Sequence, residues 1–337
     1  MSRRALLCIL TALVLLCSSL LVGCSDYRQI KPRDGDLTVV GHVGEQEVYL
    51  EELRFVAYTY RQMMTERYGD GIFEGEDKEY YLGLLKELVY ANITADYAVL
   101  SLCGEVGIGM GETAILERLE KRMTETVEEL GGMSEYKRFL KDNHLTDHML
   151  RRSVEISLLE SELMYIYVDD ILLIPDEDEE IYEIVKDEFI VVRHIFVPHS
   201  EDGAKNTIND VKTRLDNGED FELLLDLYGK DEDMTSEGLF ILDGYMTDDY
   251  ESVAFGLRVG ERSDVVEDEH GYYVIERLKM NTSQIMLKID RLKELYQTYT
   301  FYSMIDERQA TLTFVPTESG EEYMSDPFSG KQSEKQR

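Results

Sequence analysis

The chain has 337 residues and is strongly acidic, with 69 Asp and Glu residues against 35 Lys and Arg residues and a formal net charge of −34. This balance argues against nucleic acid as a partner and against electrostatic adhesion to anionic lipid. Hydrophobic residues make up 43% of the chain, so it can bury a substantial core, and its length favours two domains with additional tails.

Residues 1–24 are predicted to be a targeting segment that is separate from the fold. Two arginines precede an apolar stretch from Ala5 to Val22, and Gly23-Cys24 follows it in the manner of a bacterial lipobox. We expect Cys24 to be lipidated, which makes the protein extracytoplasmic and anchors it to the outer face of the bacterial cell membrane. A single transmembrane anchor is the alternative, because about eighteen apolar residues nearly span a bilayer.

A polar tether at 25–36 is predicted to lead into a mainly helical region at 37–188. Two short strands come first, at Leu37 to Val43 and Glu47 to Leu50, joined by a turn at Gly44. Apolar residues at helical spacing then predict helices at 51–68, 78–103, 111–130, 134–143 and 146–167. A further helix opens near Pro175, since proline and acidic residues both suit a first helical turn.

The segment 189–280 begins with an apolar, largely β-branched run. This run, Phe189 to Val197, predicts a buried strand that carries His194. A helix follows and is predicted to end at Gly218, and Asp220 is predicted to cap the next short helix.

The order of motifs in this segment resembles a parvulin-type peptidyl-prolyl isomerase domain. The motifs that carry the resemblance are Arg193-His194-Ile195-Phe196, Gly218 to Phe221, Gly244-Tyr245-Met246, Ala254 to Leu257, Val259-Gly260-Glu261 and Gly271 to Ile275. Two positions depart from the family pattern: Ser236 to Phe240 replaces a glycine-rich loop, and Tyr273 stands where the family has a second histidine. The resemblance implies about four antiparallel strands with helices.

The resemblance also implies a site with a polar side and an apolar pocket for the proline ring. It assigns the catalytic roles to His194, Asp231 and Tyr273. It assigns substrate binding to Met246, Tyr250, Phe255, Leu257 and His270. Prolyl isomerisation needs no metal and no cofactor, because its barrier of about 18–20 kcal/mol arises from amide resonance. From the residues alone, His194 could instead be a core histidine, and Asp231 could be one acid of a solvated run.

After residue 280 the pattern is helical up to about Arg308, and Ala310 to Val315 alternates like a strand. Residues 316–337 are polar and are expected to be disordered. Helices before the isomerase segment and a helix and strand after it resemble foldases of the PrsA and SurA type. The resemblance implies an α+β fold in which segments 37–188 and 281–315 form a helical chaperone domain and segment 189–280 is inserted into it.

Two functions stay open for this organisation. One is a foldase that isomerises X-Pro bonds in unfolded or newly secreted polypeptides, with a lipid anchor on Cys24. The other is a non-catalytic holdase with a degenerate isomerase domain, which Tyr273 favours. A solute-binding lipoprotein is disfavoured, because the chain has no alternating βαβ pattern. The oligomeric state is also open, with a homodimer among the options.

Overall fold

The computed structural model describes residues 38–143, 145–171 and 174–328. The predicted targeting segment with Cys24 and the tether at 25–36 lie outside the described residues. The described chain forms two compact units, which we call the helical unit (residues 38–171 and 300–328) and the sheet unit (residues 174–299). None of the helices in the described part of the chain is both long enough and apolar enough to cross a membrane.

The helical unit contains a small antiparallel sheet with strand order β2-β1-β7. Its strands are β1 (Val39–Val43), β2 (Gln46–Tyr49) and β7 (Phe314–Pro316). Its helical elements before residue 171 are α2 (Leu50–Tyr68), the 3₁₀ turn η1 (Asp70–Phe73), α3 (Lys78–Val106), α4 (Thr113–Glu129), α5 (Met133–Asp142), α6 (Asp147–Tyr165) and the π-helical turn η2 (Ile166–Asp170). The predicted strand pair and the five helices predicted between residues 51 and 167 are confirmed.

Local sequence explains where these helices start and which face they bury. The Thr146 side chain accepts the N–H of Met149 at 3.1 Å, which caps the first turn of α6 at the predicted start of this helix. In α4, Leu119, Met123 and Val127 fall at four-residue spacing, and all three are buried in a cluster with α5. This spacing puts them on one helix face, so burying them holds α4 against α5.

The C-terminal segment returns to the first strand of the chain. β7 pairs with β1, with Val43 opposite Phe314. The expectation of disorder from residue 316 is wrong for α13 (Glu318–Ser325). Thr317 caps this helix, and its N–H donates to the carbonyl of Val40 at 2.9 Å. The polar composition of the tail hid two buried apolar residues, Tyr323 and Met324, which anchor α13.

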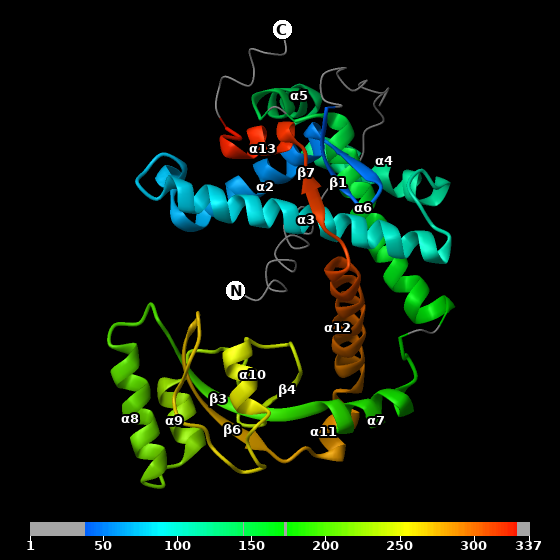
Figure 1. Cartoon of the computed structure of the whole chain (residues 1–337). Helices are drawn as coiled ribbons and strands as arrows, with labels where there is room; N and C mark the ends of the chain where they lie inside the picture. The colour runs from blue at the N-terminus through cyan, green and yellow to red at the C-terminus, as the bar shows by residue number, and fades with distance from the viewer. Residues whose placement is uncertain (1–37, 144, 172–173, 329–337) are drawn as a thin grey trace. The chain divides into compact units, whose positions relative to one another are not determined.

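The sheet unit is built on four antiparallel strands in the order β4-β3-β6-β5 (Figure 1). The strands are β3 (Phe189–Pro198), β4 (Leu239–Leu242), β5 (Val266–Glu267) and β6 (Gly271–Leu278). The helices are α7 (Asp178–Glu188), α8 (Ala204–Asp216), α9 (Phe221–Tyr228), α10 (Asp248–Ala254), α11 (Thr282–Leu287) and α12 (Ile289–Ala310), which ends in the helical unit. The α+β fold class and the four antiparallel strands are confirmed.

Both faces of β3 are buried, by different helices. Ile195 and Val197 pack in one cluster with residues of α8 and α9. Ile190 and Val192 pack in another cluster with residues of α10. Because side chains alternate along a strand, His194 points to the same face as Val192, toward α10.

The unit boundaries differ from the predicted domain boundaries at 188/189 and 280/281. α7 belongs with the sheet unit because Ile181 and Val185 pack in one cluster with Phe189 and Val191. α11 and the first part of α12 also belong there, and Ile285 lies in the same cluster. Apolar packing against β3 therefore extends the sheet unit at both ends beyond the motifs that predicted it.

Candidate active site

His194 lies in the middle of β3, and its side chain is almost fully buried. Its Nδ1 lies 2.9 Å from the hydroxyl of Tyr250 on α10, and its Nε2 lies 3.0 Å from Oδ2 of Asp231. A carboxylate can only accept, so we assign the ring proton to Nε2, which donates to Asp231, while Nδ1 accepts from Tyr250. Both ring nitrogens therefore have partners, and the imidazole has one fixed orientation.

Asp231 lies in the loop after α9 and is the member of this group that reaches solvent, with 31% of its side chain exposed. The hydrogen bond from His194 lowers the pKa of the Asp231 carboxyl, and the backbone N–H of Asp233 adds to this effect. Asp231 is therefore an ionised carboxylate at neutral pH. Its direct contact with His194 distinguishes it from the other acids of the run.

Three rings meet edge to face at the centre of the group, and we call His194, Tyr250 and Tyr273 the aromatic trio. The Tyr273 ring centroid lies 5.2 Å from that of His194 and 5.2 Å from that of Tyr250, and the centroids of His194 and Tyr250 are 5.5 Å apart. Such perpendicular contacts are favourable for aromatic pairs. Burial raises the pKa of both tyrosine hydroxyls, so both are neutral donors at ordinary pH.

The predicted apolar residues lie in one cluster with this trio. Met246, Phe255 and Leu257 pack together with Tyr250 and Tyr273 on the α10 side of the sheet. The structure thus brings together seven of the eight residues that the sequence assigned to the site, by direct contact or by shared packing.

His270 lies apart from this group. It precedes β6, its side chain is half exposed, and its Nε2 faces Glu269 at 3.7 Å. The position of His270 therefore does not support the expected role of this residue in substrate binding. The hairpin turn before Gly271 directs its side chain toward solvent.

Phe196 and Glu251 also contact this group, although the sequence did not predict them as site residues. Phe196 stacks on Tyr273 with ring centroids 4.7 Å apart. Glu251 is buried in α10 and accepts the N–H groups of Gly244 and Met246 at 2.7 and 2.6 Å, which fastens the turn carrying Met246 to this helix. The available sequence signal for Glu251 was an acidic residue four positions after the cap Thr247. Its hydrogen-bond partners, the N–H groups of Gly244 and Met246, could not be identified without the fold.

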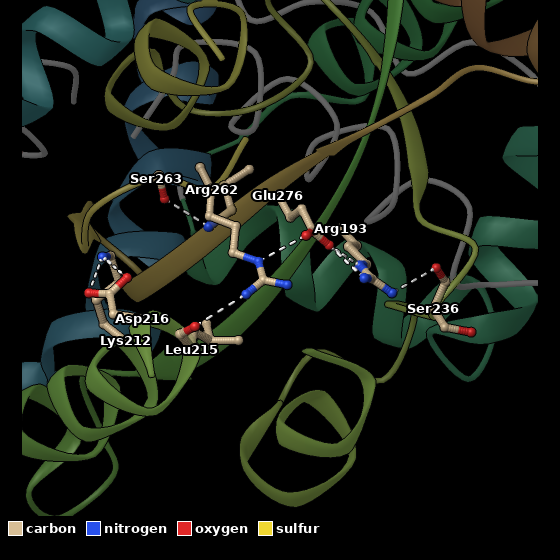
Figure 2. A network of polar contacts seen from close by, with 9 residues as sticks. Arg193, Lys212, Leu215, Asp216, Ser236, Arg262, Ser263 and Glu276 are labelled. Atoms are coloured by element: carbon tan, nitrogen blue, oxygen red, sulfur yellow. Dashed lines mark hydrogen bonds and ion pairs between the residues drawn. The ribbon is translucent and has the colours of Figure 1, made fainter. Parts of the chain in front are cut away.

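A charged network lies on the opposite face of the sheet (Figure 2). Arg193 pairs across the strands with Glu276, which also binds Arg262, at 2.6 Å and 2.9 Å respectively. Both guanidinium groups lie over the Phe221 ring, at 4.5 and 5.7 Å from its centroid. The cross-strand pair of Arg193 and Glu276 supports the observed register of β3 against β6.

The sequence around the candidate site is similar to sequences of known proteins. Residues 194–279 match the family model for the rotamase domain of the PPIC-type PPIase class. The foldase protein PrsA of Geobacillus kaustophilus is 32% identical over 39% of this chain and 44% of its own length. The foldase protein PrsA of Oceanobacillus iheyensis is 26% identical over 48% of this chain and 52% of its own length. The chain thus spans about half the length of these curated relatives.

Among solved structures, the peptidylprolyl isomerase PrsA from Bacillus anthracis is similar over 65% of this chain and 96% of its own, with 20% identity and a TM-score of 0.32. The match to the family model is confined to the sheet unit and includes the aromatic trio, Asp231 and the apolar cluster. Residues 194–279 are therefore similar to a PPIC-type PPIase domain.

Proposed function

We propose that this chain is an extracytoplasmic foldase whose PPIC-type domain catalyses cis/trans isomerisation of X-Pro bonds in unfolded or newly secreted polypeptides. The observation that carries the proposal is His194, held between Asp231 and Tyr250 within the segment that matches the family model. Uncatalysed isomerisation takes tens to hundreds of seconds, which is slow enough to limit the folding of a secreted chain.

The apolar side of the site suits a proline ring. Met246 and Phe255 are half-buried and Leu257 is almost fully buried, so the first two offer apolar surface to a substrate. Holding the ring there leaves the preceding carbonyl free to rotate about the C–N bond. Binding then lowers the isomerisation barrier, provided that the polar groups of the site bind the twisted amide more tightly than the planar amide.

The polar side supplies that preference through Asp231. Amide resonance places partial negative charge on the carbonyl oxygen, and this charge falls when the C–N bond twists. A fixed carboxylate beside the carbonyl raises the energy of the planar form more than that of the twisted form. His194 keeps Asp231 ionised and in place, and the trio keeps His194 in place, so no covalent step is needed.

The remaining parts of the proposal concern the rest of the chain. We assign client binding to the helical unit (residues 38–171 and 300–328), which lacks α7, α11 and the first part of α12 that the sequence placed in the chaperone domain, and membrane attachment to a lipid on Cys24. Both assignments rest on the sequence resemblance. In this arrangement the isomerase domain would act on segments that the helical region keeps unfolded.

The test is isomerisation of proline tetrapeptides by the full chain. We expect acceleration by the wild type and a loss of kcat/KM of about tenfold or more on Asp231→Asn, His194→Ala and Met246→Ala, because each removes a charge-assisted contact or apolar surface. Asp226→Asn, an exposed acid on α9, is the matched control and should have no effect. A wild type that does not exceed the uncatalysed rate would overturn the catalytic proposal.

A second function, a holdase with an inactive isomerase domain, is favoured by one observation. Tyr273 stands where the family has its second histidine, and a phenol offers one donor where an imidazole has two nitrogens. An inactive wild type that gains activity on Tyr273→His, while the full chain still suppresses aggregation of an unfolded protein, would identify this function. An active wild type would exclude it.

A further inference from the structure

A buried carboxylate that the site described above does not use lies in the hairpin between β5 and β6. Asp268 follows β5, and its side chain is 7% exposed. Its Oδ1 accepts the N–H groups of His270 and Gly271 at 2.8 and 3.1 Å, and its Oδ2 accepts the Thr247 hydroxyl at 2.8 Å. A carboxylate is stable at this depth only when its oxygens are hydrogen-bonded, and these three donors meet that need.

The hairpin between β5 and β6 places Asp268 beside Tyr273. Val266 pairs with Tyr273 and Glu267 pairs with Tyr272. Since side chains alternate, Asp268 lies on the face of Val266 and Tyr273. The Asp268 carboxylate also adds to the effect of burial in raising the pKa of the Tyr273 hydroxyl. The Asp268 carboxylate and the Tyr273 side chain therefore share one face of the hairpin.

Asp268 also reaches the second tyrosine of the trio, through one hydroxyl group. Thr247 caps α10, where its oxygen accepts the N–H of Tyr250 at 3.4 Å. The Thr247 hydroxyl donates its single proton to Asp268, so its oxygen keeps a lone pair that accepts the Tyr250 N–H at the start of α10. The direction of the Thr247 hydroxyl thus depends on Asp268, and the start of the helix that carries Tyr250 depends on Thr247.

We propose that Asp268 is the positioning residue of the aromatic trio, holding Tyr273 directly and Tyr250 through Thr247. A phenol has only one O–H, so a tyrosine at this position needs a fixed acceptor to keep one orientation, and Asp268 supplies it. The inference rests on the proposed isomerase function for its catalytic consequence. Asp268 itself contacts no substrate in this scheme.

The kinetic test uses the full chain and proline tetrapeptides. Asp268→Asn keeps the side-chain shape and is expected to lower kcat about tenfold with little change in KM, because it disturbs orientation and not substrate contact. Asp264→Asn is the control: this acid lies just before β5, is fully exposed and faces Lys212 at 3.5 Å. Thr247→Val, which keeps Asp268, should lower kcat in the same direction; an unchanged kcat would overturn the link to α10.

Coupling to Tyr273 is tested by a double-mutant cycle. In a Tyr273→Phe background, Asp268→Asn should cost much less than it costs in the wild type, because the hydroxyl that it orients is already absent. Full additivity of the two losses would show that Asp268 does not act through Tyr273.

A spectroscopic readout separates this inference from the proposed function. With ¹³Cζ-labelled tyrosine, the Tyr273 signal is assigned by its loss in Tyr273→Phe. Asp268→Asn should move this signal and Asp264→Asn should leave it in place, whether or not the chain is an active isomerase. A signal that Asp268→Asn does not move would overturn the positioning role even in an active enzyme.

Discussion

The contribution of the Asp231 carboxylate to stability depends on pH. Its pKa is lowered in the folded chain, mainly by the hydrogen bond from His194, so the contribution is fully present above the ordinary value of 3.8 and is lost as the pH falls through the lower folded value. We expect Asp231→Asn to reduce the free energy of unfolding of the sheet unit by about 1.5–3 kcal/mol at pH 7, the range for a hydrogen bond to a charged group. That penalty should shrink below pH 4.

Hydrogen exchange of the β3 amides in wild type and variant, measured from pH 3 to pH 7, checks this prediction. The difference between the two proteins removes the effect of the many other carboxyl groups, and Asp226→Asn reports the effect of an exposed acid. A penalty that is constant over the whole range would show that the contact with His194 does not depend on the charge of Asp231.

Among individual residues, the sequence predicts the site residues that stand at fixed places in the family motifs. His194, Asp231 and Tyr273 were identified because each stands at a fixed place in a family pattern, and the structure brings them together. Glu251 and Asp268 were not identified as site residues. Their roles come from backbone N–H groups and a hydroxyl that the fold brings near.

At the scale of elements, the Glu276 carboxylate on β6 forms ion pairs with Arg193 on β3 and with Arg262. Glu276→Gln removes the negative charge between Arg193 and Arg262 and leaves two guanidinium groups without it. We expect a loss of stability on the order of 3 kcal/mol, at the lower end for broken buried pairs because both arginines are partly exposed. Glu267→Gln on the neighbouring β5, which breaks an exposed pair with Lys205 at 3.2 Å, is the control and should cost much less than Glu276→Gln.

Denaturant unfolding gives the loss of stability in each variant. Hydrogen exchange shows which amides of β3 and β6 lose protection. Equal losses for Glu276→Gln and Glu267→Gln would show that the network adds no more than a surface ion pair. Loss of protection in β3 and β6 together, with β4 less affected, is the expected pattern, because the ion pair joins only the central strands.

Most elements were predictable from the sequence, including the short strands β1, β2 and β7, whereas the positions of β4, β5 and α13 were not. β3 and α3 contain enough residues for their apolar pattern to be recognised. β4 and β5 have four and two residues, and only the family resemblance implied strands beyond β3 and β6; they pair with β3 and β6 respectively in the sheet. α13 was missed for a related reason, since its stability comes from contact with β1 and not from its own composition.

At the scale of the whole molecule, the two ends of the helical unit are joined by a contact that only glycine permits. A Cβ atom on Gly320 of α13 would lie 2.1 Å from the carbonyl oxygen of Val40 in β1, so Gly320→Ala must push α13 away from the sheet. The same substitution at Gly83, an exposed position of α3 with nothing within 4 Å, should stabilise its helix by up to about 1 kcal/mol. The two variants therefore change stability in opposite directions.

Hydrogen exchange of the full chain resolves where the loss occurs. Gly320→Ala should lower protection in β1 and α13 by about 1–3 kcal/mol, the range for overpacking, while the amides of β3 and β6 keep theirs. Because the predicted clash involves only Val40, proline isomerisation by the sheet unit should also be unchanged. Loss of protection throughout both units would mean that they unfold as one cooperative body, and the C-terminal return would then stabilise the isomerase domain as well as the helical unit.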